Sequence, residues 1–140
     1  MSMEWTPNLS TGVVWQDRQH KELFSKVNAL LTAIDAGIGQ KEVIKLLDFL
    51  DEYFVVHFEA EEQAMNLCDY PDTVAHLTAH TNFIDEMSRL RAEAADNVTH
   101  ELVVHTQLKV ADWFVNHIAN IDKRLGEYIL KAEKRRKGRG

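Results

Sequence analysis

Seven side chains of the kinds that bind metal ions are spread over four segments of the chain, and their spacing constrains the fold. Residues four apart on an α-helix project from the same face, so a His-x-x-x-Glu pair and a His-x-x-x-His pair each point one way. Two further histidines share their helical faces with apolar residues. Such a pattern is typical of helices that turn one face toward a common core. The seven residues are His20, His57, Glu61, His76, His80, His117 and Asp122.

Long stretches of the chain have the periodicity of amphipathic helices, and only two prolines interrupt it. We expect helices over 17–36, 41–67, 72–95 and from Thr99 to at least Leu125, where Gly126 leaves the last end undefined. Because short connections force neighbouring helices to run antiparallel, the sequence predicts an all-α fold, an up-down-up-down antiparallel four-helix bundle. Turn-forming residues in 1–16 predict an irregular N-terminal arm.

The 140 residues fit a single domain, 1–140, with the bundle over 17–130 and a basic tail over 131–140. We interpret the tail as the solvated end of the last helix, with a docking tail as the alternative. The net charge of −6 disfavours nucleic acid or an acidic membrane as a partner. A single cysteine excludes an intrachain disulfide, and no window is apolar enough for membrane insertion. We expect a cytoplasmic, soluble protein.

The inward direction of the ligand-type side chains indicates metal binding, because a buried polar group without a partner is costly. Seven ligands are too many for one tetrahedral zinc, so they indicate two ions. Five imidazoles with two carboxylates that can bridge fit two iron ions. The Glu-x-x-His pairs of ferritin-like di-iron proteins are missing, which disfavours that class. A structural bundle with adventitious metal is the alternative, and we interpret His100 and His105 as surface residues.

The spacing of His117 and Asp122 leaves two arrangements open. Five residues correspond to a rotation of about 140° around a regular helix, so the two side chains would not share a face. Either they approach the site at different heights, or the helix widens locally into a π-type turn, as helices often do at functional sites.

Four motifs make the chain similar to a known family. They are D-R-Q-H-K-E-L-F at 17–24, H-F-E-A-E-E-Q-A-M at 57–65, Y-P-D-T-V-A-H-L-T-A-H at 70–80 and W-F-V-N-H-I-A-N-I-D at 113–122. With them, the chain resembles the bacterial hemerythrins over essentially all of residues 3–130. The resemblance implies a hemerythrin-like domain with a non-haem di-iron centre that has a bridging oxo or hydroxo group. One iron would be held by His76, His80 and His117, the other by His20 and His57 with one open position, and Glu61 and Asp122 would bridge them.

The resemblance also implies a function, namely reversible O2 binding at the open iron for oxygen storage, delivery or sensing. We therefore expect no enzyme; the alternative is a di-iron enzyme that reduces O2, peroxide or nitric oxide. We expect a monomer, whose protein partner would be an oxygen-consuming or signalling protein. Trp15, just ahead of His20, could narrow an access route. By helical spacing from the ligands, an apolar O2 pocket is expected from Phe24, Phe54, Phe58, Ile84, Trp113 and Ile118.

Overall fold

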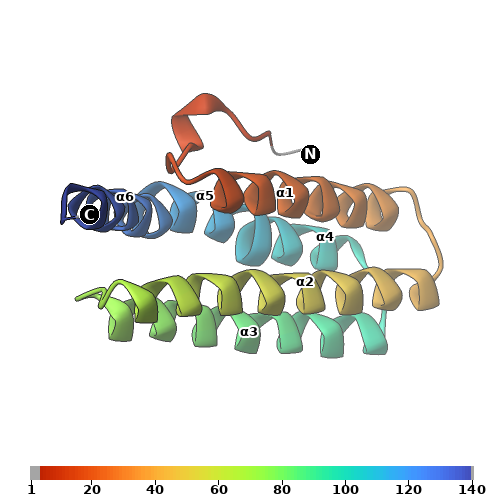
Figure 1. Ribbon diagram of the computed structural model, residues 1–140. Helices are drawn as coiled ribbons and strands as arrows, with labels where there is room; N and C mark the ends of the chain where they lie inside the picture. The colour runs from red at the N-terminus through yellow and green to blue at the C-terminus, as the bar shows by residue number, and fades with distance from the viewer. Residues whose placement is uncertain (1–3, 140) are drawn as a thin grey trace.

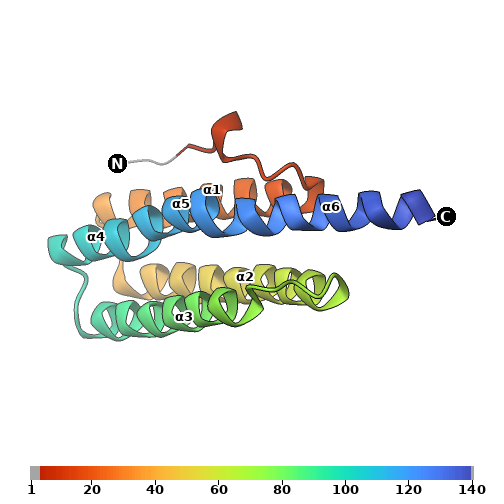
Figure 2. The same cartoon turned by 90° about the vertical axis from the view of Figure 1, so that its left-hand side faces the viewer.

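The computed structural model describes residues 4–139, and within that range it is helical with no strand. Three long helices come first: α1 (Val14–Asp35), α2 (Gln40–Leu67) and α3 (Thr73–Asp96) (Figure 1). A short 3-10 turn, η1 (Pro7–Leu9), precedes them. The fourth rod is one continuous run with two π-helical stretches in it (Figure 2). Its parts are α4 (His100–Thr106), η2 (Gln107–Asp112), α5 (Trp113–His117), η3 (Ile118–Asp122) and α6 (Lys123–Arg139).

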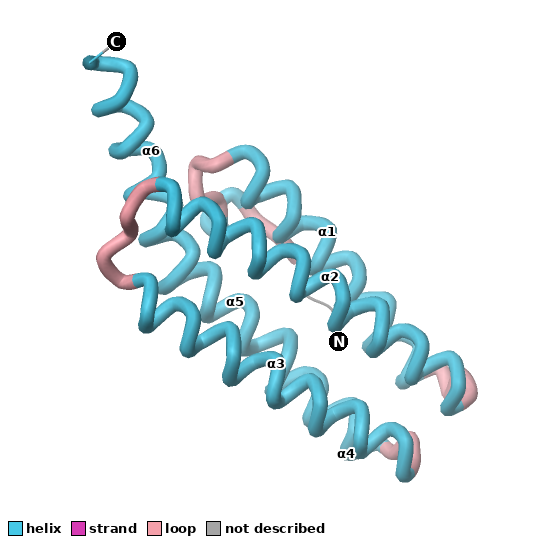
Figure 3. Tube along the Cα trace, turned by 60° about the horizontal axis from the view of Figure 1, so that its bottom comes forward, coloured by secondary structure: helices cyan, strands magenta, loops and turns pink. Residues whose placement is uncertain are grey.

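The four rods form an antiparallel bundle, which confirms the predicted fold class. Helix α2 packs against both α1 and α3, and the rod of α4 to α6 packs against α1 and α3. Short loops join the rods at the two ends of the bundle (Figure 3). None of the helices within the described residues is long and apolar enough to cross a lipid bilayer.

The first helix begins at Val14, three residues before the predicted start, so the predicted arm over 1–16 is too long. Asp17 lies in the first turn of this helix, and its carboxylate binds the arm. Its carboxylate accepts hydrogen bonds from Ser10 Oγ at 2.6 Å and from the Thr11 main-chain N–H at 2.8 Å. The arm therefore folds back onto the first turn of α1. Residues 1–3 of the predicted arm and Gly140 of the predicted tail lie outside the described residues.

A glycine forms the turn after α1. Gly37 has a φ of +72°, a conformation that glycine adopts without strain. The main-chain N–H of Ile38 bonds to the carbonyl of Ala33 at 3.1 Å, and that of Gly37 bonds to Ile34 at 3.2 Å. This pair of bonds is the Schellman motif that closes helix C-termini, and it sends the chain directly into α2.

The last helix passes through Gly126 and continues to Arg139, so the basic segment is not a separate tail. Residues 133–138 are exposed, and the end of α6 projects beyond the other three rods (Figure 2). The choice between a solvated helix end and a docking tail stays a prediction. A residue without a side chain fits at position 126 because the arm passes close by. A Cβ built on Gly126 would be 2.7 Å from the Thr11 carbonyl oxygen.

The core consists of two apolar clusters separated along the bundle by buried polar side chains. Along α2, Phe54 and Phe58 belong to the larger cluster and Met65 to the smaller one, with Glu61 between them. The fourth rod repeats this order, because Ile118 belongs to the larger cluster and Leu125 to the smaller one, on either side of the buried Asp122. The polar layer is thus closed off from water on both sides.

Candidate metal centre

The structure brings all seven predicted ligand residues together in the polar layer, and all seven are buried. Each of the four rods contributes at least one of them. Their donor atoms form two groups, each with all of its atoms within 4.8 Å of one another. One group is Glu61, His76, His80, His117 and Asp122, and the other is His20, His57, Glu61 and Asp122. The two groups share both carboxylates, as expected for two ions joined by bridging ligands.

Asp122 turns one oxygen toward each group. Its Oδ2 lies 2.9 Å from Nε2 of His20. Its Oδ1 lies 2.9 Å from Nε2 of His117 and 3.2 Å from Nε2 of His76. The carboxylate of Asp122 therefore stands between the two sets of imidazoles.

Glu61 makes the second connection between the groups. Its Oε1 lies 3.1 Å from Nε2 of His80 and 3.4 Å from Nε2 of His76. The same oxygen lies 3.5 Å from Nε2 of His57, which belongs to the other group. Both carboxylates are thus placed where two adjacent cations would need a shared anionic ligand.

The helix widens between His117 and Asp122, which decides between the two arrangements left open by the sequence. Residues Ile118–Asp122 form a π-helical stretch. Because a π-helix turns less per residue than an α-helix, a spacing of five returns to nearly the same face. The second widening, η2 at Gln107–Asp112, was not predicted, and the sequence has no ligand pair there that would have indicated it.

The hydrogen-bonding state of the site fits metal ligands. Although the nitrogen and oxygen atoms of the seven side chains lie close together, many of them do not form hydrogen bonds with one another. Buried polar atoms normally have a partner, and each exception costs about 1–3 kcal/mol. Metal coordination would satisfy these atoms together. The unpartnered atoms nearest the shared carboxylates are Nε2 of His20, His57, His80 and His117, and both carboxylate oxygens of Asp122. The Nδ1 atoms of His20, His76, His80 and His117 also lack a hydrogen-bond partner within the described residues.

The protonation states also suit cation binding. Burial and Asp122 oppose ionisation of Glu61, but His57 and the contacts from His76 and His80 lower its pKa to about 2. Burial likewise opposes ionisation of Asp122, yet the close imidazoles, His117 first, hold its pKa well below the usual range. The layer therefore contains two negative charges away from water, which need compensation by bound cations or by protonated imidazoles.

Two histidines differ in their proton affinity. Burial lowers the pKa of His57 to about 4, against the attraction of Glu61, so its imidazole is neutral at neutral pH. Burial would also lower the pKa of His76, but contacts with Asp122 and Glu61 outweigh it and raise the pKa to about 9. Without a metal ion, a proton on His76 thus compensates part of the carboxylate charge.

An outer hydrogen bond fixes one of the imidazole rings, and the sequence alone did not identify it. Nδ1 of His57 donates to Oε1 of Gln19 at 2.7 Å, which leaves its Nε2 as the ligand atom. Nδ1 of His80 lies 3.7 Å from Oε1 of Glu62. The hydrogen bond to Gln19 turns Nε2 of His57 toward Glu61, whereas the distance between His80 and Glu62 is too long for a hydrogen bond.

The expected apolar pocket residues line two different sides of the centre. Phe58 stacks on His80 with ring centroids 3.8 Å apart, and Trp113 stacks on His117 at 4.4 Å. Ile84 borders the same side, in a surface cavity with Phe58 and His80. These three therefore adjoin the three-histidine group.

The other side of the centre includes a residue that sequence reasoning missed. Phe114 packs its ring edge against His20 at 5.5 Å, and it contacts Phe24 at 5.4 Å and Phe54 at 5.1 Å. All three rings are buried, and Ile118 is buried in the same cluster. Phe114 lies three residues before His117 and thus on the same helical face, a spacing that could have identified it.

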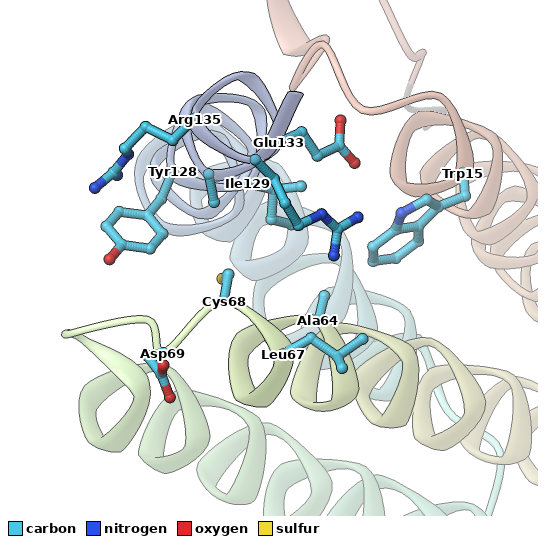
Figure 4. Close-up of a pocket in the computed structure, with 11 residues that line it drawn as sticks. Trp15, Ala64, Leu67, Cys68, Asp69, Tyr128, Ile129, Glu133 and Arg135 are labelled. Atoms are coloured by element: carbon cyan, nitrogen blue, oxygen red, sulfur yellow. The ribbon is translucent and has the colours of Figure 1, made fainter. Parts of the chain in front are cut away.

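Trp15 lies away from Phe24, Phe54 and Phe114, which together form an aromatic wall beside His20. It borders a cavity of about 410 Å³ beside the middle of α6, with Leu67, Cys68 and Ile129 (Figure 4). It also packs against the smaller apolar cluster. His100 is exposed and His105 bonds to Glu93 at 2.7 Å, so both lie outside the centre, as expected.

Comparisons with known proteins show similarity to hemerythrins over most of the chain. Residues 11–129 match the family model described as the Hemerythrin HHE cation binding domain. A bacteriohemerythrin of Methylococcus capsulatus is 35% identical, with 89% of this chain and 94% of the relative covered. A bacteriohemerythrin of Pseudomonas aeruginosa is 32% identical, with 84% and 75% covered. A crystal structure of wild-type hemerythrin superposes with a TM-score of 0.82 at 34% identity, covering 91% of this chain and 97% of that one.

Proposed function

The chain belongs to the hemerythrin family, whose members bind O2 at a di-iron centre, and we propose from this premise that it binds O2 reversibly for oxygen storage, delivery or sensing. The observation that carries the proposal is the unequal division of the ligands. Three histidines face one position and two face the other, while Glu61 and Asp122 are common to both. The position beside His20 and His57 thus has one protein ligand fewer, which provides a place for O2.

The residues of this chain would hold two irons as follows. His76, His80 and His117 would bind one ion, His20 and His57 the other, and both carboxylates would bridge them. When bound, the iron pair supplies two electrons that can be shared with O2 and recovered when it leaves. The two carboxylate charges offset part of the charge of the irons, so that the loaded centre can stay in a buried layer.

The aromatic wall supports reversible binding rather than reaction. Phe114 packs against His20, and Phe24 and Phe54 pack against Phe114, so the rings on this side can neither donate nor accept a proton. A small apolar molecule such as O2 is compatible with such a lining, whereas bulk water is excluded from it. Bound O2 would therefore leave as O2, because no proton donor among these rings drives its reduction.

The experiment is an anaerobic titration of the ferrous protein with O2, followed by removal of O2 under vacuum or argon. The proposal expects an optical absorption that appears with O2, saturates at one O2 per iron pair and disappears on deoxygenation over repeated cycles. Irreversible conversion to the ferric form in the first cycle would overturn it. Rapid consumption of peroxide or nitric oxide in the presence of a reductant would instead favour the di-iron enzyme.

A further inference from the structure

Gln16 is a fully buried polar side chain beside the two shared carboxylates. It lies in the first turn of α1, and its relative exposure is 0%. Its amide nitrogen donates to Oε2 of Glu61 at 2.7 Å and approaches the main-chain carbonyl oxygen of Asp122 at 3.4 Å. Two acceptors determine how the amide is turned, because the flipped amide would bring its oxygen against two other oxygens. The N–H groups of Gln16 therefore face the centre.

This contact gives the two oxygens of Glu61 different surroundings. Oε1 faces the imidazoles of His57, His76 and His80, whereas Oε2 accepts the Gln16 hydrogen bond. A hydrogen bond to an ionised acceptor is short and strong, which agrees with the observed 2.7 Å. Without the amide, Oε2 would be a buried charged atom with no donor from α1, and the carboxylate could rotate about its last side-chain bond.

The second contact of Gln16 involves the other shared carboxylate through its main chain. The Asp122 carbonyl is at the end of η3, the π-helical stretch that turns the Asp122 side chain toward His20 and His117. One amide thus joins α1 to the Glu61 side chain on α2 and to the Asp122 backbone on the fourth rod. Gly126 lies close to both Thr11 of the arm and this amide, because a Cβ built there would be 2.7 Å from the Thr11 carbonyl oxygen and 3.3 Å from Oε1 of Gln16.

We propose that Gln16 is a positioning residue that holds Glu61 in the orientation needed to bridge two metal ions. The inference rests on the proposed di-iron centre and concerns the affinity for the second metal ion relative to the first. A carboxylate that rotates freely can turn both oxygens to one ion, whereas the Gln16 hydrogen bond on Oε2 keeps Oε1 between the two imidazole groups, where both ions can share it. Loss of the amide therefore weakens the second ion, at the two-histidine position, more than the first. Outer hydrogen-bond partners of metal ligands change affinity by about 10- to 100-fold, which gives the size of the expected effect.

The test uses Gln16→Met, which keeps the length and approximate volume of the side chain but has no N–H. Metal-free protein is titrated with Co(II), an ion that reports its coordination through its visible absorption. The first Co(II) should bind as in the wild type, and the second about 10- to 100-fold more weakly, with an altered spectrum. The control is Gln107→Met, which removes a glutamine hydrogen bond to Asp112 in η2, outside the centre, and should change neither step.

Unchanged affinity and spectrum for both Co(II) ions in Gln16→Met would overturn the proposal. An equal loss at both steps, with a lower melting temperature of the metal-free protein, would also overturn it, because it indicates a structural role alone. If Gln16→Met does not fold, Gln16→Asn serves instead, since its amide is one methylene too short to reach Glu61. Failure of the wild type to bind two Co(II) would count against the di-iron centre itself and is thus distinguishable.

Discussion

Nε2 of His117 lies 2.9 Å from Oδ1 of Asp122, although the two residues are five positions apart in one helix. The π-helical stretch Ile118–Asp122 makes this contact, because a regular helix would direct the two side chains to different faces. The consequence extends beyond the pair. With Oδ1 on His117, the other oxygen reaches His20 on α1, so one carboxylate connects the two imidazole groups.

Asp122→Asn should therefore reduce metal binding more than its small change in shape suggests. Asparagine keeps the volume but removes a negative charge that both ions would share. We expect retained metal to fall from two ions per chain to one or none, measured by atomic emission after desalting. The control is Asp112→Asn at the end of η2, where the carboxylate is exposed. Two tightly bound ions in Asp122→Asn would contradict the bridging role.

His57→Ala should separate metal retention from O2 binding. The substitution leaves the three-histidine group complete, so one ion should remain bound, while the position proposed for O2 loses one of its two histidines. We expect no reversible optical change with O2, together with about half of the iron content. His100→Ala changes an exposed histidine and should behave as the wild type. Full O2 binding by His57→Ala would show that His57 is not a ligand.

The stability of the metal-free protein should be greatest near pH 6.5. The folded-state pKa of His76 is raised to about 9, so its contribution is complete below pH 6.5 and is lost as the pH rises toward 9. The folded-state pKa of His57 is lowered to about 4, so the unfolded chain binds more protons between pH 4 and 6.5 and stability falls as the pH falls. Each contribution is on the order of 3 kcal/mol. Melting temperatures from pH 5 to 9 measure the profile.

Metal binding should then release the proton of His76 near neutral pH, because a ligand nitrogen must be deprotonated. The heat of Zn(II) binding to the metal-free protein should therefore differ between buffers of different ionisation enthalpy. Bound metal should also raise the melting temperature, since it binds the folded state. Equal heats in all buffers would show that His76 does not exchange its proton for a metal ion.

The sequence predicted the bundle because each rod carries a regular apolar face, and it placed the seven ligand-type residues because their spacing follows those faces. Their convergence could be inferred, although their role as ligands stays a prediction. The extension of α1 to Val14 could not be predicted, because it depends on Asp17 bonding to the arm rather than to the helix. The continuation through Gly126 depends on the approach of Thr11, a contact between residues far apart in sequence. Gln16 was missed for the same reason.

Phe114→Leu should loosen the wall beside His20. The smaller side chain leaves a space where the ring now contacts His20, Phe24 and Phe54, and we expect faster loss of bound O2 and faster oxidation of the centre. Stability should fall by about 1–3 kcal/mol, since the core would repack only in part. The control is Phe83→Leu, which removes a ring of the same size that stacks on Trp113, with ring centroids 4.2 Å apart. Equal O2 dissociation rates in the two variants, measured by stopped flow, would argue against a specific role for Phe114.

Gly126→Ala should destabilise the protein although alanine is the better helix former. Helix propensity alone would favour alanine by about 1 kcal/mol. The new Cβ, however, would lie 2.7 Å from the Thr11 carbonyl oxygen and 3.3 Å from Oε1 of Gln16, so the arm or the amide must move. Gly138→Ala provides the matched control, because no atom lies within 4 Å of its new Cβ. We expect thermal unfolding to show a lower melting temperature for Gly126→Ala and an unchanged or slightly higher one for Gly138→Ala. A weaker binding of the second Co(II) in Gly126→Ala would show that crowding at position 126 reaches the centre through Gln16. Equal stabilisation by both substitutions would mean that the arm does not press on Gly126.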